Sequence, residues 1–197
     1  MTRPVKMLRL QDKSEIEAII IRCQQNDRVA QRQLYMMFAD ELMSIAIRYA
    51  KDKSMARDLV HDTFIKVYEK IGTFQLNRGS FVGWMSRILI NRAISDFRKH
   101  KRVLYQTEEV FDQACTDEVD IVQQLEAEDI LQLLQILPEG GRLIFNMYII
   151  EGYKHNEIAK ILGISPSTSR SQLTRSKALL RQAITRRHNR FKKTGTK

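Results

Sequence analysis

The stretch KHNEIAKILGISPSTSRSQLTRSKALLRQAI, residues 154–184, decides how the C-terminal part of this chain folds. Its apolar residues recur at the three- and four-residue steps of two helices. Gly163 lies between those helices and can take the positive φ of a tight turn. Ser165 can cap the second helix, and Pro166 suits its first position, where no backbone N–H is needed. Two helices joined so closely predict a helix-turn-helix.

The second of these helices is expected to face outward with polar and basic side chains, while Leu173, Leu179 and Leu180 face inward. Short hydroxyl groups can approach phosphates and base edges, and arginines can bind guanine or phosphate. Ten basic residues and no acidic ones follow residue 169, which favours DNA binding over an ordinary helical hairpin with a solvated basic face. The candidate DNA-binding residues are Ser167, Thr168, Arg170, Ser171, Thr174, Arg175 and Lys177.

The charge of the chain changes sign along its length around a net value of +10. Residues 1–102 carry 20 basic and 11 acidic side chains, residues 103–129 carry 9 acidic and no basic ones, and residues 130–169 are neutral. Two basic ends separated by an acidic segment indicate two surfaces for a polyanion. Nucleic acid is the leading candidate, because binding to a membrane surface would require a basic helix with a continuous apolar face.

The sequence gives little support for a metal site, a disulfide framework or a membrane-spanning helix. Cys23 and Cys115 have neither the number nor the spacing of a disulfide framework or a zinc site, and we expect both thiols to be inert. The four histidines are scattered, so no cofactor or metal is predicted. The apolar runs fall far short of the roughly 18 residues that a membrane helix needs, and the start lacks the layout of a signal peptide. We therefore expect a cytoplasmic protein without membrane insertion.

Helical periodicity dominates the remainder of the chain, which has only three prolines and eight glycines. Residues 33–50, 55–74 and 81–102 follow the helical pattern, with Ser54 and Ser80 as candidate N-caps. The pattern weakens where acidic residues accumulate. The predicted fold class is all-α: two small helical domains joined by an acidic linker, the C-terminal domain containing the helix-turn-helix. The predicted boundaries are 1–102 for the first domain, 103–127 for the linker, 128–187 for the second domain and 188–197 for a frayed basic tail.

The stretch RGSFVGWMSRILINRAISDFRKHKR, residues 78–102, reads as one helix whose apolar side changes part-way along. At about 100° per residue, its first turns gather apolar residues around Trp84, and its later turns gather others, around Ile94, roughly opposite. We expect the first cluster to pack against one neighbour and the second against another. The change of side vacates one face for a polar and basic stripe of Arg87, Asn91, Ser95, Arg98 and Arg102, with Lys99 at its edge.

Three stretches together resemble the extracytoplasmic-function group of bacterial sigma-70-type sigma factors: ARDLVHDTFIKVYEKIGTF, the helix just described, and LPEGGRLIFNMYIIEGYKHNEIAKILGISPSTSRSQLTRSKALLRQ. They cover most of residues 30–185 in the order of the family. The resemblance implies a sigma factor that directs transcription initiation at promoters, with no catalytic residues and no cofactor. The partners it implies are core RNA polymerase, through its β and β′ subunits, and promoter DNA, and it leaves room for an anti-sigma factor.

The resemblance also implies roles for the polar faces. Residues 56–68 match the segment that binds the clamp helices of the largest polymerase subunit, with Asp58, His61, Asp62 and Lys66 at the matching polar positions. Many relatives have Gln-Glu in place of His61-Asp62. Residues 75–102 match the part that reads and opens the −10 element, where a loop captures an unstacked base in a close-fitting pocket with cations nearby. The −10 candidates are Asn77, Arg78, Ser80, Arg87, Asn91, Ser95, Arg98, Lys99 and Arg102.

Residues 165–177 match the helix that reads the −35 element, with one departure. Ser169 stands where relatives usually have Val, so we expect looser packing or a shifted register at that position. Trp84 lies on the first apolar side of its helix, which favours a place in the core over a stacking platform for melted bases. The acidic linker of the family runs near the polymerase active centre. In this chain, residues 103–129, with a net charge of −9, could mimic nucleic acid there.

Two other classes of protein compete with this interpretation. A helix-turn-helix regulator would bind duplex DNA without polymerase, but it would leave the Asp58/His61/Asp62/Lys66 face and the basic stripe without a function. A recombinase or transposase would need an acidic cluster, a nucleophile motif or metal-ligand spacing, and none is convincing in this sequence.

Overall fold

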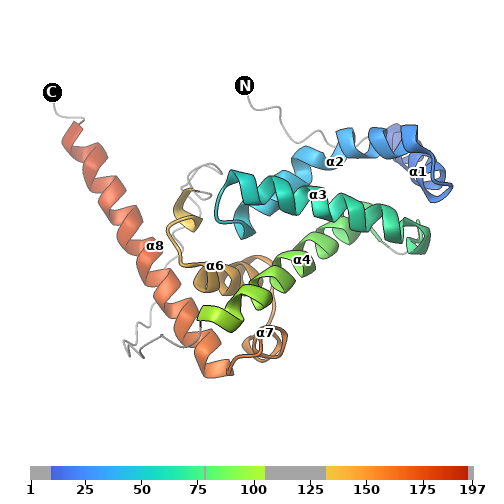
Figure 1. Cartoon of the computed structure of the whole chain (residues 1–197). Helices are drawn as coiled ribbons and strands as arrows, with labels where there is room; N and C mark the ends of the chain where they lie inside the picture. The colour runs from blue at the N-terminus through green and yellow to red at the C-terminus, as the bar shows by residue number, and fades with distance from the viewer. Residues whose placement is uncertain (1–9, 78, 105–131, 195–197) are drawn as a thin grey trace. The chain divides into compact units, whose positions relative to one another are not determined.

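The computed structural model describes residues 10–77, 79–104 and 132–194, which are helical apart from turns and short connections (Figure 1). Contacts divide the chain into two compact units. The first comprises the described parts of 1–46 and 56–92, and the second those of 47–55 and 93–197. The division falls inside three helices, so it differs from the boundaries expected from the sequence, which placed the whole of 1–102 in one domain. None of the described helices combines the length and apolarity needed to cross a bilayer.

The first unit is built from α1 (Leu10–Gln24), most of α2 (Arg28–Tyr49) and of α3 (Lys53–Lys70), the short η1 (Ile71–Thr73) and the first half of α4 (Phe81–Leu104). Polar and aromatic contacts join them: Gln24 Nε2 donates to the carbonyls of Ile71 and Phe74 at 3.0 and 3.2 Å, and the Phe38 and Phe81 rings meet edge-on. The core consists of apolar side chains buried between the helices, among them Ile20, Leu34, Leu42, Phe64, Val67, Met85 and Leu89.

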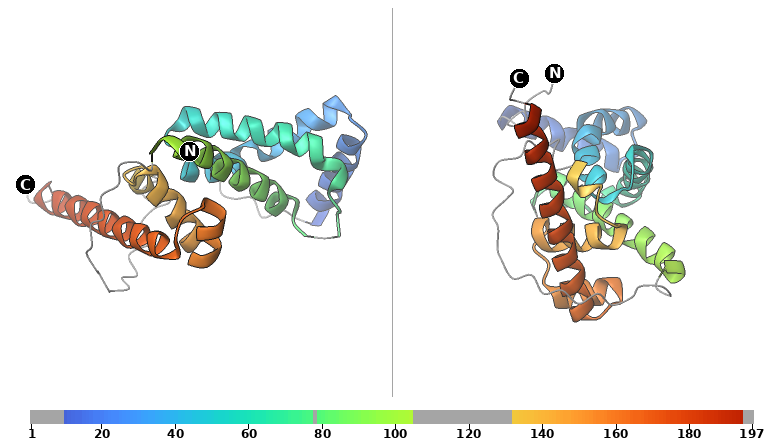
Figure 2. Two further views of the ribbon diagram at one scale, coloured as in Figure 1. Left: turned by 60° about the horizontal axis from the view of Figure 1, so that its bottom comes forward. Right: turned by 90° about the vertical axis from the view of Figure 1, so that its left-hand side faces the viewer.

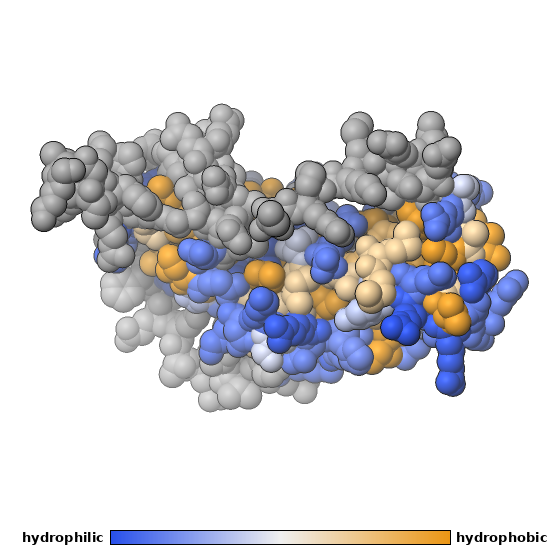
Figure 3. Space-filling model, turned by 90° about the horizontal axis from the view of Figure 1, so that it is seen from above, coloured by the Kyte–Doolittle hydropathy of each residue, from blue (hydrophilic) through white to orange (hydrophobic). Residues whose placement is uncertain are grey.

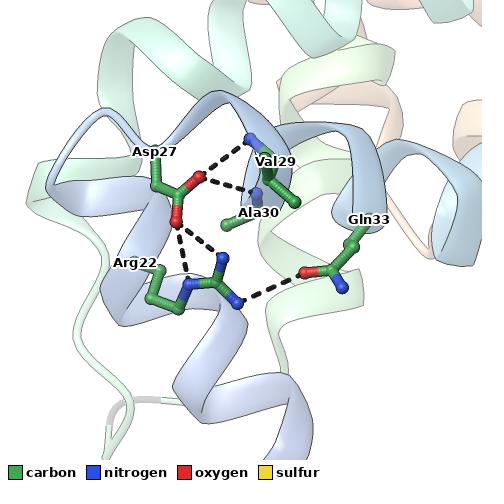
Figure 4. A network of polar contacts seen from close by, with 5 residues as sticks. All are labelled: Arg22, Asp27, Val29, Ala30 and Gln33. Carbon is green, nitrogen blue, oxygen red and sulfur yellow. Dashed lines mark hydrogen bonds and ion pairs between the residues drawn. The ribbon is translucent and has the colours of Figure 1, made fainter.

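Aspartates fix where α2 and α3 begin. One Asp27 oxygen accepts the backbone N–H groups of Val29 and Ala30 at 2.8 and 3.2 Å, and the other accepts two bonds from Arg22 of α1 (Figure 4). The Arg22 guanidinium and the helix N–H groups hold the pKa of Asp27 below its usual value. Asp52 accepts the N–H of Met55 at 2.9 Å. The prediction that Ser54 caps α3 is therefore wrong, because the helix begins at Lys53, two residues before the predicted start at Met55, and Asp52 supplies the acceptor.

The second unit contains α6 (Glu139–Phe145), which continues into the π-helical turn η3 (Asn146–Ile150), then α7 (His155–Leu162) and α8 (Pro166–Thr194). Figure 2 shows α6 and α7 lying beside the N-terminal half of α8. The apolar side chains buried among them include Leu134, Ile144, Met147, Ile158, Leu162 and Leu173. Helix α8 continues to Thr194, so most of residues 188–197 is helical and not the frayed tail that we predicted.

Candidate nucleic-acid interface

The turn between α7 and α8 has the geometry that the sequence predicts. Gly163 ends α7 with φ +65°, in the left-handed region, and the N–H of Ile164 donates to the carbonyl of Ala159 at 3.1 Å. Ser165 Oγ accepts the N–H of Thr168 at 3.0 Å, and Pro166 is the first residue of α8. This arrangement holds two helices in the helix-turn-helix layout, in which the second helix is the one that enters a DNA major groove.

The seven candidate residues of α8 all reach the surface to some degree. Ser167, Arg170, Ser171 and Lys177 are exposed, whereas Thr168, Thr174 and Arg175 are partly buried. Hydroxyl groups at the start of α8 bond to one another: Ser165 Oγ lies 2.7 Å from Ser167 Oγ and 2.8 Å from Thr168 Oγ1. The face therefore offers oriented hydroxyls at the start of the helix and cations further along it, which suits contacts to phosphates and base edges.

The inward face of α8 differs from the prediction in two ways: two predicted core leucines are not buried, and two serines are. Leu173 is buried as expected, but Leu179 is 37% exposed and Leu180 is only partly buried. Ser169 and Ser176 are buried in their place, at 0% and 1% exposure. Their small side chains let neighbouring helices approach closely: a Cβ built on Gly141 of α6 would lie 2.6 Å from Ser176 Oγ.

The polar stripe of α4 lies on its solvent side. Arg87, Asn91, Ser95, Arg98 and Lys99 are exposed, and Arg102 belongs to the same helix but its side chain lies outside the described residues. The change of apolar side also has a structural counterpart: Phe81, Met85 and Leu89 are buried in the first unit, and Ile94 and Phe97 are buried in the second. The helix thus contributes to two cores and leaves one basic face to solvent.

The loop before α4 supplies the other −10 candidates. Asn77 and Ser80 are exposed, and Arg78 lies outside the described residues. Gly79 has φ +127°, a conformation that favours glycine, and Ser80 Oγ accepts the N–H of Gly83 at 3.4 Å, a long capping bond. Trp84 is half-buried, with its ring stacked on Phe81 at 5.5 Å and tilted against Phe74 at 5.3 Å. These contacts place it in an aromatic cluster beneath the loop.

The four polar candidates on α3 do not form one open face. Asp58 and His61 are exposed. Asp62, however, accepts two bonds from Arg92 of α4, at 2.8 and 3.1 Å, and Lys66 pairs with Glu69 at 2.6 Å. Sequence reasoning missed Arg92 because its partner lies 30 residues away on another helix. An exposed ion pair of this kind contributes at most about 1 kcal/mol, so its main effect is to orient α3 and α4.

Two further surface features were not expected from the sequence. Apolar side chains reach the surface as separate areas among hydrophilic ones on the face seen in Figure 3. Val29, Met36 and Met37 line a shallow groove between α1 and α2, and Met36 is 73% exposed. Among the described residues, no three His, Cys, Asp or Glu side chains lie close enough together to hold a metal ion.

Comparison with known proteins identifies the family. The model of sigma-70 region 2 matches residues 34–103, and that of sigma-70 region 4 matches residues 127–180. The RNA polymerase sigma factor NccH of Alcaligenes xylosoxydans xylosoxydans is 29% identical over 176 residues, which cover 86% of this chain and 94% of that protein. The ECF RNA polymerase sigma factor SigW of Bacillus subtilis is 27% identical, with 86% and 96% covered.

A solved structure completes the comparison. The sigma factor RpoE, in complex with the anti-sigma factor NepR from Bartonella quintana, matches 78% of this chain and 96% of that chain at 23% identity, with a TM-score of 0.45. The matched regions follow the order region 2 then region 4, and the two described surfaces, the stripe of α4 and the outward face of α8, fall one in each. The chain belongs to the extracytoplasmic-function group of the sigma-70 family of RNA polymerase sigma factors.

Proposed function

We propose that this chain is a promoter-specificity subunit that binds core RNA polymerase and directs it to promoters to initiate transcription. The observation that carries the proposal is the presence, in one chain and in the order of the family, of a basic stripe on α4 and a helix-turn-helix ending in α8. The polymerase supplies the chemistry of nucleotidyl transfer. This chain supplies recognition and strand separation, acts in the cytoplasm and is not an enzyme.

In this proposal, the −10 element is read by the loop around Asn77 and by the stripe of α4. Duplex opening exposes single-stranded phosphates and unstacked bases, which a row of cations with nearby aromatic support can hold. The proposed domain boundaries remain those predicted: 1–102 for the polymerase-binding and −10 part, 103–127 for the acidic linker and 128–187 for the −35 part. The linker lies outside the described residues.

The outward face of α8 reads the −35 element, and α3 binds the β′ clamp helices. Asp58 and His61 are the polymerase contacts that we favour on α3, since both are exposed and no hydrogen bond ties either to another helix in the described part of the chain. Asp62 and Lys66 remain candidates, although each must exchange its ion pair for a polymerase contact. An anti-sigma factor is a further proposed partner.

One experiment separates these surfaces. In holoenzyme reconstituted with core polymerase, Arg87→Ala/Arg98→Ala should weaken promoter opening about tenfold or more while leaving core binding unchanged, because each cation lost removes one phosphate contact. Asp58→Ala/His61→Ala should do the reverse: core binding weakens, and promoter opening per bound chain is kept. Permanganate reactivity of the −10 thymines measures opening, and titration of labelled chain measures core binding.

The matched control is Arg28→Ala/Arg32→Ala, which removes two exposed cations from α2 and so the same net charge. It should leave opening per bound chain near wild type. If the control and the α4 variant lose opening equally, the stripe has no specific part in opening and its proposed role is wrong. The alternative, a regulator that acts without polymerase, predicts tight duplex binding by the free chain and no effect of the α3 changes.

A further inference from the structure

A polar pair, of which one member is buried and the other partly buried, joins the two helices of the helix-turn-helix. His155 is the first residue of α7, and its Nδ1 atom forms a hydrogen bond of 2.9 Å with the Oγ of Ser169 in α8. Ser169 is completely buried. The imidazole is also held from the side of η3, because the ring of Tyr148 stacks on it with centroids 4.4 Å apart and planes 21° apart. The ring of His155 therefore bridges three consecutive elements.

This bond matters because of what Ser169 would be without it. A buried hydroxyl with no partner costs about 1–3 kcal/mol. From the sequence we expected looser packing or a shifted register at Ser169. His155 supplies a partner instead, so the serine is accommodated without exposure. The two residues act as a matched pair, and neither signals its role in the sequence, since they lie 14 positions apart.

The pair lies directly behind the outward face of α8. Arg170 follows Ser169 in the chain, and burial, with Arg170 and Lys177 adding their charges, lowers the pKa of His155 below its usual value. The two cations thus lie close enough to His155 to influence it electrostatically. A change in how α8 sits on His155 would move these side chains, because rotation of a helix about its axis displaces every residue on its surface.

We propose that His155 is a positioning residue for −35 recognition: its bond to Ser169 sets the rotation of α8 against α7, and so the placement of Arg170 and its neighbours on the DNA. The proposal rests on the proposed function of α8. It assigns His155 no contact with DNA. Recognition of base edges needs donors held within roughly 0.5 Å of the productive geometry, so a small rotation is enough to weaken it.

Three variants separate positioning from simple stability. His155→Phe keeps a ring to stack on Tyr148 but leaves the Ser169 hydroxyl unpaired. His155→Phe/Ser169→Ala also removes the hydroxyl, so no buried polar group is left unpaired. His155→Asn places a polar amide atom near the position of Nδ1 but has no ring. Thr185→Ala, on the exposed side of α8, is the control.

Two measurements are made on each. Thermal unfolding of the free chain reports stability. Transcription by the reconstituted holoenzyme, compared between a promoter that wild type uses and the same promoter with its −35 element replaced, reports −35 discrimination. We expect His155→Phe to lower both the melting temperature and the −35 discrimination, with the discrimination falling about fivefold. The double variant should regain the melting temperature but not the discrimination, and His155→Asn should keep the discrimination despite a lower melting temperature.

The proposal is overturned if discrimination follows the melting temperature across the three variants, because His155 then acts only through stability. It is also overturned if all variants discriminate as wild type does. A wild-type holoenzyme that initiates at promoters without any dependence on the −35 element would instead overturn the proposed function of α8, and the inference with it.

Discussion

Cys23 illustrates how burial decides the chemistry of one side chain. Its thiol is fully buried on α1, and burial, reinforced by the nearby Asp27 carboxylate and opposed by Arg22, raises its pKa to about 11. The thiolate is the reactive form of cysteine, and at pH 8 it would amount to about one molecule in a thousand. The sequence predicted an inert thiol from the absence of a motif, and the packing of the first unit gives the physical reason.

This predicts that native Cys23 resists alkylation. In a Cys115→Ser background, iodoacetamide at pH 8 should label the folded chain at least about a hundredfold more slowly than the chain unfolded in guanidinium, which mass spectrometry measures. Because the folded-state pKa is raised, labelling should accelerate as the pH rises toward 11. Equal rates for the folded and unfolded chain would show that Cys23 is accessible and contradict its placement in the core.

At the scale of elements, the contact between α6 and α8 depends on two small residues. Ser176 is buried, and a Cβ on Gly141 would lie only 2.6 Å from its hydroxyl oxygen but 4.0 Å from its Cβ. Gly141→Ala should therefore destabilise the chain by about 1–3 kcal/mol, the usual cost of overpacking a core. Removing the hydroxyl as well, with Gly141→Ala/Ser176→Ala, should restore most of the loss, because the oxygen that clashes is gone.

Chemical denaturation of the full chain measures both variants, with Ser176→Ala alone as the reference for the lost hydroxyl. The hydroxyl of Ser176 donates to the carbonyl of Gln172 at 2.8 Å, so this single change should have a modest effect. A double variant as unstable as Gly141→Ala, or a Gly141→Ala variant as stable as wild type, would contradict close packing of α6 on α8 at this position.

Some element-scale features could be predicted from local sequence and others could not. The turn at Gly163, Ser165 and Pro166 depends on the backbone preferences of the residues themselves, so it was predictable. The start of α3 was not, because Asp52 and Ser54 are both good caps and the sequence does not decide between neighbouring acceptors. The exposure of Leu179 was missed because helical periodicity does not reveal where the partner of a long helix ends.

At the scale of the whole molecule, the pattern of motifs in the sequence was enough to predict an all-helical chain, and the two DNA-facing surfaces stay a prediction. Contacts between residues that are far apart in the sequence could not be predicted from that pattern. Asp62 and Arg92 are 30 residues apart, and only the packing of α3 on α4 brings them together. The same holds for His155 and Ser169, which are 14 residues apart and meet only because α7 packs against α8.

The change of apolar side in α4 shows how these scales meet. An apolar side that switches half-way along a helix is costly in an isolated domain, since one cluster would face water. In this chain the two clusters are buried in different units, and the stripe of Arg87, Asn91 and Arg98 stays exposed. The switch is thus a feature of the whole molecule, although it can be seen within 25 residues of sequence.

The most direct test of the proposed function is promoter-directed transcription from purified components. Core RNA polymerase, the full chain and a library of promoter fragments are combined, and the RNA 5′ ends are sequenced. We predict transcripts with defined starts that require both the chain and core, from fragments that share two sequence elements upstream of the start. Tight binding of the free chain to duplex fragments, with no gain in initiation when core is present, would contradict a sigma factor and support a regulator that acts alone.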